Sequence, residues 1–191
     1  KLSDARLPFR DRDGGLMAIT RLASLEPTTS AASFTTISGA YKALIIMGQT
    51  KSDDSSSGTT MSSQIYMQFN SDSGSNYRKN FIYTSGTSYG GTNDGSGTTQ
   101  TQCYWESANS YSSYLGWGGW HVLIPDYAIA GATKAAQVEF ATITTSAIAS
   151  SKTGVQGWSW SGTDAITTIT FTDQHGDFVS GTNIVLYGLE V

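Results

Sequence analysis

The sequence predicts an all-β protein, and the expected architecture is an antiparallel, jelly-roll-like β-sandwich. Apolar residues recur at every second position in several short segments, which is the pattern of half-buried strands. Stretches rich in Gly, Ser and Asn separate these segments, as turns separate strands. No window of the sequence has an apolar stripe with helical spacing over three turns. Many short strands joined by such turns are typical of a sandwich or barrel, and among these folds we favour the jelly roll.

The clearest strand is expected at 64–69, where Ile65, Met67 and Phe69 share one face. The segment 40–48 is apolar on both faces, which predicts a central strand. Shorter segments with the same patterns complete the set. The expected strands are 17–25, 40–48, 64–69, 81–84, 120–124, 137–140, 167–171 and 184–187.

Turn-forming residues predict how the strands are joined. The segments 70–76 (NSDSGSN) and 173–177 (DQHGD) lie between strand patterns, and each is expected to be a hairpin loop. The segment 85–119 is dense in Gly, Ser and Thr and is expected to form one long loop. Loops of this length in a compact domain are usually functional or disordered, and the aromatic residues here argue against disorder. A second Gly- and Ser-rich loop is expected around Trp158 and Trp160.

The first 25 residues differ in charge from the rest of the chain. They hold five basic and three acidic residues, a net charge of +2, whereas six basic and twelve acidic residues give 26–191 a net charge of −6. This asymmetry predicts an N-terminal arm over 1–25 that docks on a partner, and a β-sandwich domain over 26–191. The alternative is a partly ordered terminus. The candidate docking residues of the arm are Arg6, Arg10, Arg12 and Arg21.

Composition argues against several classes of protein. The net charge of −4 disfavours a general nucleic-acid binder, which needs a basic surface. The longest aliphatic run, 43–47, is far shorter than the roughly 20 residues of a membrane span. The single cysteine, Cys103, excludes an internal disulfide framework and a multi-cysteine zinc site. Only 14% of residues are charged, and a surface made of Ser, Thr and aromatic residues suits a protein–protein interface.

Two patterns resemble sites of chemistry, and in both the structural interpretation is favoured. The segment 86–90 matches G-x-S-x-G around Ser88, but no helix is expected after it, as a hydrolase elbow requires. Asp173, His175 and Asp177 alternate and would gather a metal ion on one side of a turn, but a solvated turn explains them as well. We therefore expect no enzymatic activity, no catalytic residue, no metal and no cofactor.

Aromatic residues in the expected long loop are the best candidates for ligand contact. Flat rings accept the apolar face of a pyranose, polar neighbours read its hydroxyl groups, and rigid Tyr and Trp side chains lose little entropy on binding. The alternative, which we favour, is that these rings pack their own loop or a neighbouring subunit. The candidate glycan-binding residues are Tyr89, Tyr104, Trp105, Tyr111, Tyr114 and Trp117.

Four segments of the chain carry a family resemblance. They are 34–48 (FTTISGAYKALIIMG), 68–77 (QFNSDSGSNY), 124–127 (IPDY) followed by Lys134, and 166–189 (ITTITFTDQHGDFVSGTNIVLYGL). In this order they resemble a β-sandwich domain that is common among virion proteins of tailed bacteriophages, called tail-fibre, appendage or minor structural proteins. The resemblance covers about 16–191. The family usually has Gly-Ser before the last strand, where this chain has Gly181-Thr182.

The resemblance implies a jelly-roll fold and a place on the surface of a virus particle. It therefore implies a non-enzymatic virion structural protein, either a tail fibre or appendage or a capsid decoration protein, at the head, neck or tail. Its partners would be other virion proteins and further copies of itself, with a trimer favoured. The aromatic candidates add a host-surface glycan as a partner, whereas the composition argues against nucleic acid and against a membrane span. The alternatives are a stand-alone carbohydrate-binding module and a hydrolase of a surface polymer, of which the hydrolase is disfavoured.

Overall fold

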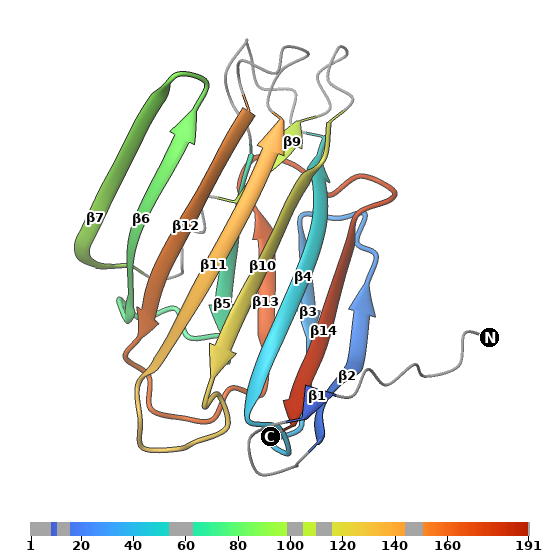
Figure 1. The fold of residues 1–191 in the computed structure, drawn as a ribbon, viewed down its shortest axis with the longest axis vertical. Coiled ribbons are helices and arrows are strands. Elements are labelled where there is room, and N and C mark those ends of the chain that lie inside the picture. Colours follow the sequence, from blue (N-terminus) through green and yellow to red (C-terminus); the bar gives the residue numbers. More distant parts are fainter. Residues whose placement is uncertain are drawn as a thin grey trace.

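The computed structural model describes residues 9–10, 16–53, 63–98, 105–109, 116–143 and 151–190. These residues form thirteen strands and no helix, so none of them builds a helix that would cross a membrane. The strands form two antiparallel sheets that pack face to face (Figure 1). The predicted all-β sandwich is confirmed.

The larger sheet is in front in Figure 1, and every neighbouring pair of its strands is antiparallel. Its order across the sheet is β1-β2-β14-β4-β10-β11-β12-β6-β7. In chain order, its strands are β1 (Phe9–Arg10), β2 (Leu16–Leu25), β4 (Ala43–Ser52), β6 (Tyr77–Ser85), β7 (Ser88–Thr98), β10 (Gly118–Pro125), β11 (Lys134–Ile143), β12 (Ser151–Trp160) and β14 (Asn183–Glu190).

The smaller sheet lies behind the larger one and has the order β3-β13-β5-β9. A short parallel bridge between the end of β4 and β9 connects the two sheets. From β3 to β6 the chain alternates between the sheets, as it does in a jelly roll, but the larger sheet has more strands than that eight-stranded pattern. The jelly-roll topology stays a prediction. The strands of the smaller sheet are β3 (Ala31–Phe34), β5 (Ser63–Phe69), β9 (Trp105–Asn109) and β13 (Ile169–Asp173).

The core lies between the sheets and consists of alternate residues of each strand. On β10, Trp120, Val122 and Ile124 are buried, whereas Leu123 faces the outside. Aromatic rings fill much of the layer, because they bury the most apolar area for each residue. The rings of Phe69 and Trp158 stack at 4.9 Å between centroids, and Trp120 meets the ring of Phe171 at 5.6 Å.

Two expected hairpin loops are connections between the sheets. The segment 70–76 joins β5 of the smaller sheet to β6 of the larger one, and 174–182 joins β13 to β14 in the same way. The predicted turns are present, but the prediction that each turn closes a hairpin is wrong, because the strands on either side of it belong to different sheets. Each strand has one apolar face, and that face can be buried against the opposite sheet without pairing to the next strand in sequence.

The predictions of a long loop at 85–119 and of a loop around Trp158 are also partly wrong, because both segments contain strands. The chain makes a two-residue turn at 86–87 and returns as the edge strand β7, and Gly86 takes a positive φ of 58° that suits such a turn. Strand β9 follows, and β12 places Trp158 and Trp160 in the core. An edge strand needs backbone pairing on one side only, so a polar, Gly-rich sequence is compatible with it.

The expected arm and the larger sheet share residues 16–25. These residues form β2, which pairs with β14, so the predicted strand at 17–25 is confirmed. Arg21 is exposed on β2 opposite Tyr187, and only the backbone of Arg10 is described, in β1. Arg6 and Arg12 lie outside the described residues. The docking role of the arm stays a prediction.

Candidate functional site

The turn 70–76, which carries part of the family resemblance, is held by side-chain hydrogen bonds. The Asp72 carboxylate accepts bonds from Trp160 Nε1 (2.6 Å), from the backbone N–H of Gly74 (2.8 Å) and from Asn76 Nδ2 (2.9 Å). Burial by itself raises the pKa of Asp72, but these three donors outweigh it and leave the pKa below its usual value. The turn is therefore fixed to the aromatic core by one carboxylate.

Asn70 and Tyr77 extend the same network across the sandwich. Asn70 Oδ1 accepts bonds from the backbone N–H groups of Thr167 (2.9 Å) and Thr168 (3.1 Å), which lead into β13. The Tyr77 hydroxyl accepts a bond from the Phe69 N–H at 3.0 Å. Burial raises the pKa of Tyr77 to about 12. This part of the resemblance consists of residues that join the sheets.

A second structural cluster surrounds the turn between β10 and β11. Lys134 is buried and donates hydrogen bonds to the carbonyl oxygens of Ile129 (2.6 Å) and Ala132 (2.5 Å). Burial lowers the pKa of Lys134, and the carboxylates of Asp164 and Asp126 partly offset this effect. The Lys134 ammonium thus holds the turn that follows the IPDY motif.

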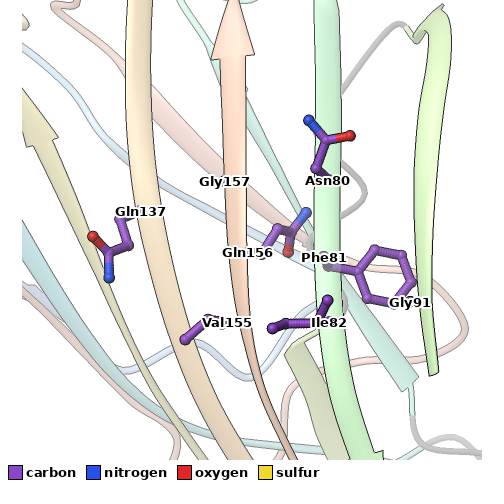
Figure 2. A pocket seen from close by; sticks show the side chains of 8 residues that line it. All are labelled: Asn80, Phe81, Ile82, Gly91, Gln137, Val155, Gln156 and Gly157. Atoms are coloured by element: carbon purple, nitrogen blue, oxygen red, sulfur yellow. The ribbon is translucent and has the colours of Figure 1, made fainter. Parts of the chain in front are cut away.

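The outer face of the larger sheet, which faces away from the core, carries two shallow hollows. One has a volume of about 730 Å³ and the other about 560 Å³. Figure 2 shows that the residues around the first hollow come from the neighbouring strands β11, β12, β6 and β7. Ile82 and Val155 line both hollows and lie directly opposite each other on β6 and β12. We call the two hollows and this apolar pair the outer-face groove.

The first hollow is open because of a glycine. Gly157 lies between Gln137 on β11 and Asn80 on β6. A Cβ atom at Gly157 would have no heavy atom within 4 Å. Because side chains stand nearly perpendicular to a sheet, a missing side chain in this row leaves a notch between two amide side chains. The floor of the hollow at Gly157 is backbone, the amides of Asn80 and Gln137 stand on either side of it, and the apolar side chains of Ile82 and Val155 also line the hollow.

The second hollow lies at the other side of the apolar pair, toward the turn between β6 and β7. Tyr89 on β7 is 90% exposed. Thr84, which pairs with Tyr89, shares a hydrogen bond with Thr153 on β12, at 2.9 Å between the two hydroxyl oxygens. Ile82 is 65% exposed, although it is a large aliphatic residue. The groove thus combines an apolar centre with hydroxyl groups and an exposed ring at this end.

The groove carries little charge. Among the described residues that line it, Glu139 is the only one that is charged at neutral pH. Its carboxylate lies 3.9 Å from His121 Nε2 on β10 and accepts a hydrogen bond from Gln137 Nε2 at 3.3 Å. The electrostatic character of the groove is therefore that of amides and hydroxyls.

The structure places two of the predicted glycan-binding side chains and does not bring them together. Tyr89 lines the groove at the edge of the sheet. Trp117 directly precedes β10, and three strands (β11, β12 and β6) separate β10 from β7, which carries Tyr89. The Trp117 side chain is half-buried beside Gly181, and Lys51 Nζ lies 6.0 Å from its ring centroid. Of Trp105 only the backbone is described, in β9. The predictions for Tyr104, Tyr111 and Tyr114 lie outside the described residues.

The groove itself was missed by the sequence analysis. Its amides and its notch come from Asn80, Gln137 and Gly157, which lie within strands and not in an aromatic loop. The signal was present in 153–159, where alternate residues are small or polar and Val155 is the exception. The Gly and Ser residues of that segment predict a loop, and a loop has no alternating outward face.

The two patterns that resembled sites of chemistry have structural explanations. Ser88 begins β7 directly after a tight turn and is not on a strand-to-helix elbow. Asp173 Oδ1 accepts bonds from Ser52 Oγ (3.1 Å) and from the backbone N–H of His175 (3.1 Å), so this carboxylate orders its own turn. Within the described ranges, no three metal-binding side chains come together.

Comparison with known proteins does not add a function to this geometry. No protein-family model matches the chain, and no curated protein matches it. The outer-face groove is therefore interpreted from its own residues. It is the candidate functional site because it combines hollowed shape, exposed apolar side chains and polar groups that are free of strong charge.

Proposed function

We propose that the chain is a non-enzymatic structural protein of a tailed-bacteriophage particle that contacts a host-surface glycan. The virion role, as tail fibre, appendage or capsid decoration protein, is supported by the family resemblance. The residues that carry it include Asn70, Asp72 and Lys134, which hold the connections between strands. Such residues preserve a fold and not a chemistry, so this support is an argument from fold similarity.

One observation carries the glycan contact, namely the groove on the outer face of the larger sheet. It is open, it presents Tyr89 and the amides of Asn80 and Gln137, and its centre is aliphatic. Flat, weakly charged surfaces with aromatic and amide groups suit sugars, which offer both C–H faces and hydroxyl groups. The same observation supports the alternative of a stand-alone carbohydrate-binding module.

The copy number of the chain in purified particles from its source tests the virion role. Quantitative mass spectrometry against the major shell protein gives this number. Hundreds of copies support a decoration protein, and a few to several dozen copies support a fibre or appendage. A particle without the chain overturns the virion role and leaves the carbohydrate-binding module as the proposed function.

We also propose that the chain forms oligomers, with a trimer favoured. The outer face of the larger sheet exposes several large apolar side chains besides those of the groove, among them Met47 and Leu123. Met47 and Leu123 lie on the paired strands β4 and β10, and exposed apolar surface often marks a protein–protein interface. Light scattering of the purified chain at micromolar concentration tests this, and a monomer there contradicts self-association of the isolated chain.

A further inference from the structure

We propose that the outer-face groove binds an uncharged polysaccharide chain that lies along β12 and β6, with Gly157 providing the space for one sugar ring and Tyr89 contacting the chain at the other end. This inference rests on the proposed glycan contact and adds the ligand class, the orientation and the residue that decides access. It differs from the expected aromatic loop, because the binding surface is built on strands.

The length of the groove favours a chain over a single sugar. From Thr153 to Gly157 the strand advances four residues, which is about 13 Å at the usual rise of β-strands. The two hollows lie on either side of the Val155–Ile82 pair along this direction. A ligand that fills both must cross this apolar pair, and the C–H face of a sugar ring is suited to that contact.

The charge of the groove selects an uncharged ligand. Glu139 is the one lining residue among those described that is charged at neutral pH, and it is already engaged by Gln137 and lies near His121. A polyanion such as nucleic acid or an acidic polysaccharide would meet a carboxylate and no lysine or arginine among the described lining residues. Amide groups at Asn80 and Gln137 both donate and accept, which matches sugar hydroxyls.

The position of the groove on a sheet face disfavours an extended peptide. Peptides that bind to sheets usually add a strand at an edge, where backbone N–H and C=O groups are unpaired. Strands β12 and β6 are interior strands, and their backbone groups are already paired with β11 and β7. A peptide over this face would gain no backbone ladder, so side-chain hydroxyls and amides have to supply the polar contacts.

The test uses the purified full chain and compares two glycine variants. The probes are neutral hexasaccharides of glucose, mannose and galactose, with a hexasaccharide of galacturonic acid as the acidic comparison, measured by isothermal titration calorimetry. We expect at least one neutral hexasaccharide to bind with a Kd below about 1 mM. Gly157→Val fills the notch and is expected to weaken that binding by about tenfold or more, and Tyr89→Ala by several fold.

Gly119→Val is the matched control. Gly119 also lies exposed on the outer face of the larger sheet, on β10, and a Cβ there would meet only Ala141 O at 4.0 Å. It does not line either hollow. This variant is expected to bind within twofold of the wild type, and circular dichroism and thermal unfolding of all variants show whether the fold is kept.

Three outcomes would overturn the proposal. The first is that no neutral hexasaccharide binds at millimolar concentration. The second is that the acidic hexasaccharide binds and the neutral ones do not. The third is that Gly157→Val leaves binding unchanged while it alters the oligomeric state in light scattering, which would make this face an interface between copies. Binding is measured without particles, so its failure leaves the copy-number test of the virion role unaffected.

Discussion

The inner and outer faces of the larger sheet use glycine in opposite ways. On the inner face, a Cβ at Gly48 would lie 2.1 Å from Trp120 Cζ2, so the indole ring occupies the space that a side chain would need. On the outer face, Gly157 has open space where its side chain would be. The inner glycine is therefore required for packing, whereas the outer glycine keeps a surface hollow empty.

The same contrast extends to the surroundings of each glycine. Trp120 is buried and donates a hydrogen bond from Nε1 to Thr50 Oγ1 at 3.1 Å, so its ring is fixed in place. The residues beside Gly157 are Gln137 and Asn80, whose amide side chains are exposed to solvent. Close packing makes a core sensitive to one added methyl group, and an open surface is not.

The largest expected effect is at the inner glycine. Gly48→Ala should destabilise the protein by about 3 kcal/mol, because Trp120 cannot leave its site without breaking its bond to Thr50 and disturbing the core. Urea unfolding monitored by tryptophan fluorescence measures this change. Gly119→Ala on the neighbouring strand is the control and should lie within about 0.5 kcal/mol of the wild type. Equal stability of the two variants would contradict the comparison.

The next effect concerns the carboxylate that joins the turn to the core. Asp72→Ala should destabilise the protein by about 2 kcal/mol, because the buried Trp160 indole N–H loses its acceptor. Ser73→Ala, at an exposed position of the same turn, is the control and should change little. The free energies of unfolding in urea at pH 7 measure both variants.

The pH dependence of the Asp72 variant sharpens this prediction. The folded-state pKa of Asp72 is lowered, so its stabilisation is present above the unfolded pKa of about 3.8 and is lost as the pH falls through the folded value. The difference between wild type and Asp72→Ala should therefore shrink in acid. A difference that is constant from pH 7 to below pH 3 would show that the charge of the carboxylate does not contribute.

A smaller effect is expected at alkaline pH from Tyr77. Burial raises the folded-state pKa of Tyr77 to about 12, from the ordinary tyrosine value of 10.0. The folded state therefore keeps its proton where the unfolded state loses it, and stability should fall as the pH rises from about 10 to about 12. Tyr77→Phe, which has no titrating hydroxyl, should show a shallower decline in urea midpoints over this range. An equal decline in both proteins would contradict this assignment.

The strands and their buried faces can be predicted from the sequence, whereas the pairing of the strands cannot. Alternation such as that of Ile65, Met67 and Phe69 predicts strands and their buried faces, because burial on one side has a period of two. The hairpin pairing predicted for the strand that ends at Phe69 is wrong, because the turn 70–76 has the same residues whether it closes a hairpin or connects two sheets. The core position of Trp158 was missed for a related reason, since its Gly- and Ser-rich neighbours belong to the exposed face of β12.

Of the residues that line the groove, only Tyr89 was among the predicted glycan-binding residues. The argument that predicted it does not explain its position in the groove. The prediction used the density of aromatic residues along the chain, whereas the groove brings together Asn80, Gln137 and Gly157 from three strands. Gly157 pairs with Gln137, 20 positions away in the sequence, and with Asn80, 77 positions away, and both pairings exist only through the order β11-β12-β6. Strand order depends on long-range pairing, which short patterns do not encode.

The smallest expected change in the free energy of unfolding is at Gly157, and it tests whether the notch beside this residue is open in solution. Gly157→Ala should stabilise the protein by about 0.5 kcal/mol, because glycine weakens a strand and the added methyl group meets open space. Urea midpoints of this variant and of Gly119→Ala measure the gain. A gain at Gly157 means that the wild type keeps the notch although a more stable sequence is one substitution away, as is common at binding sites. A loss of more than about 1 kcal/mol would mean that the notch is filled in solution, and the groove would then be part of an interface between copies.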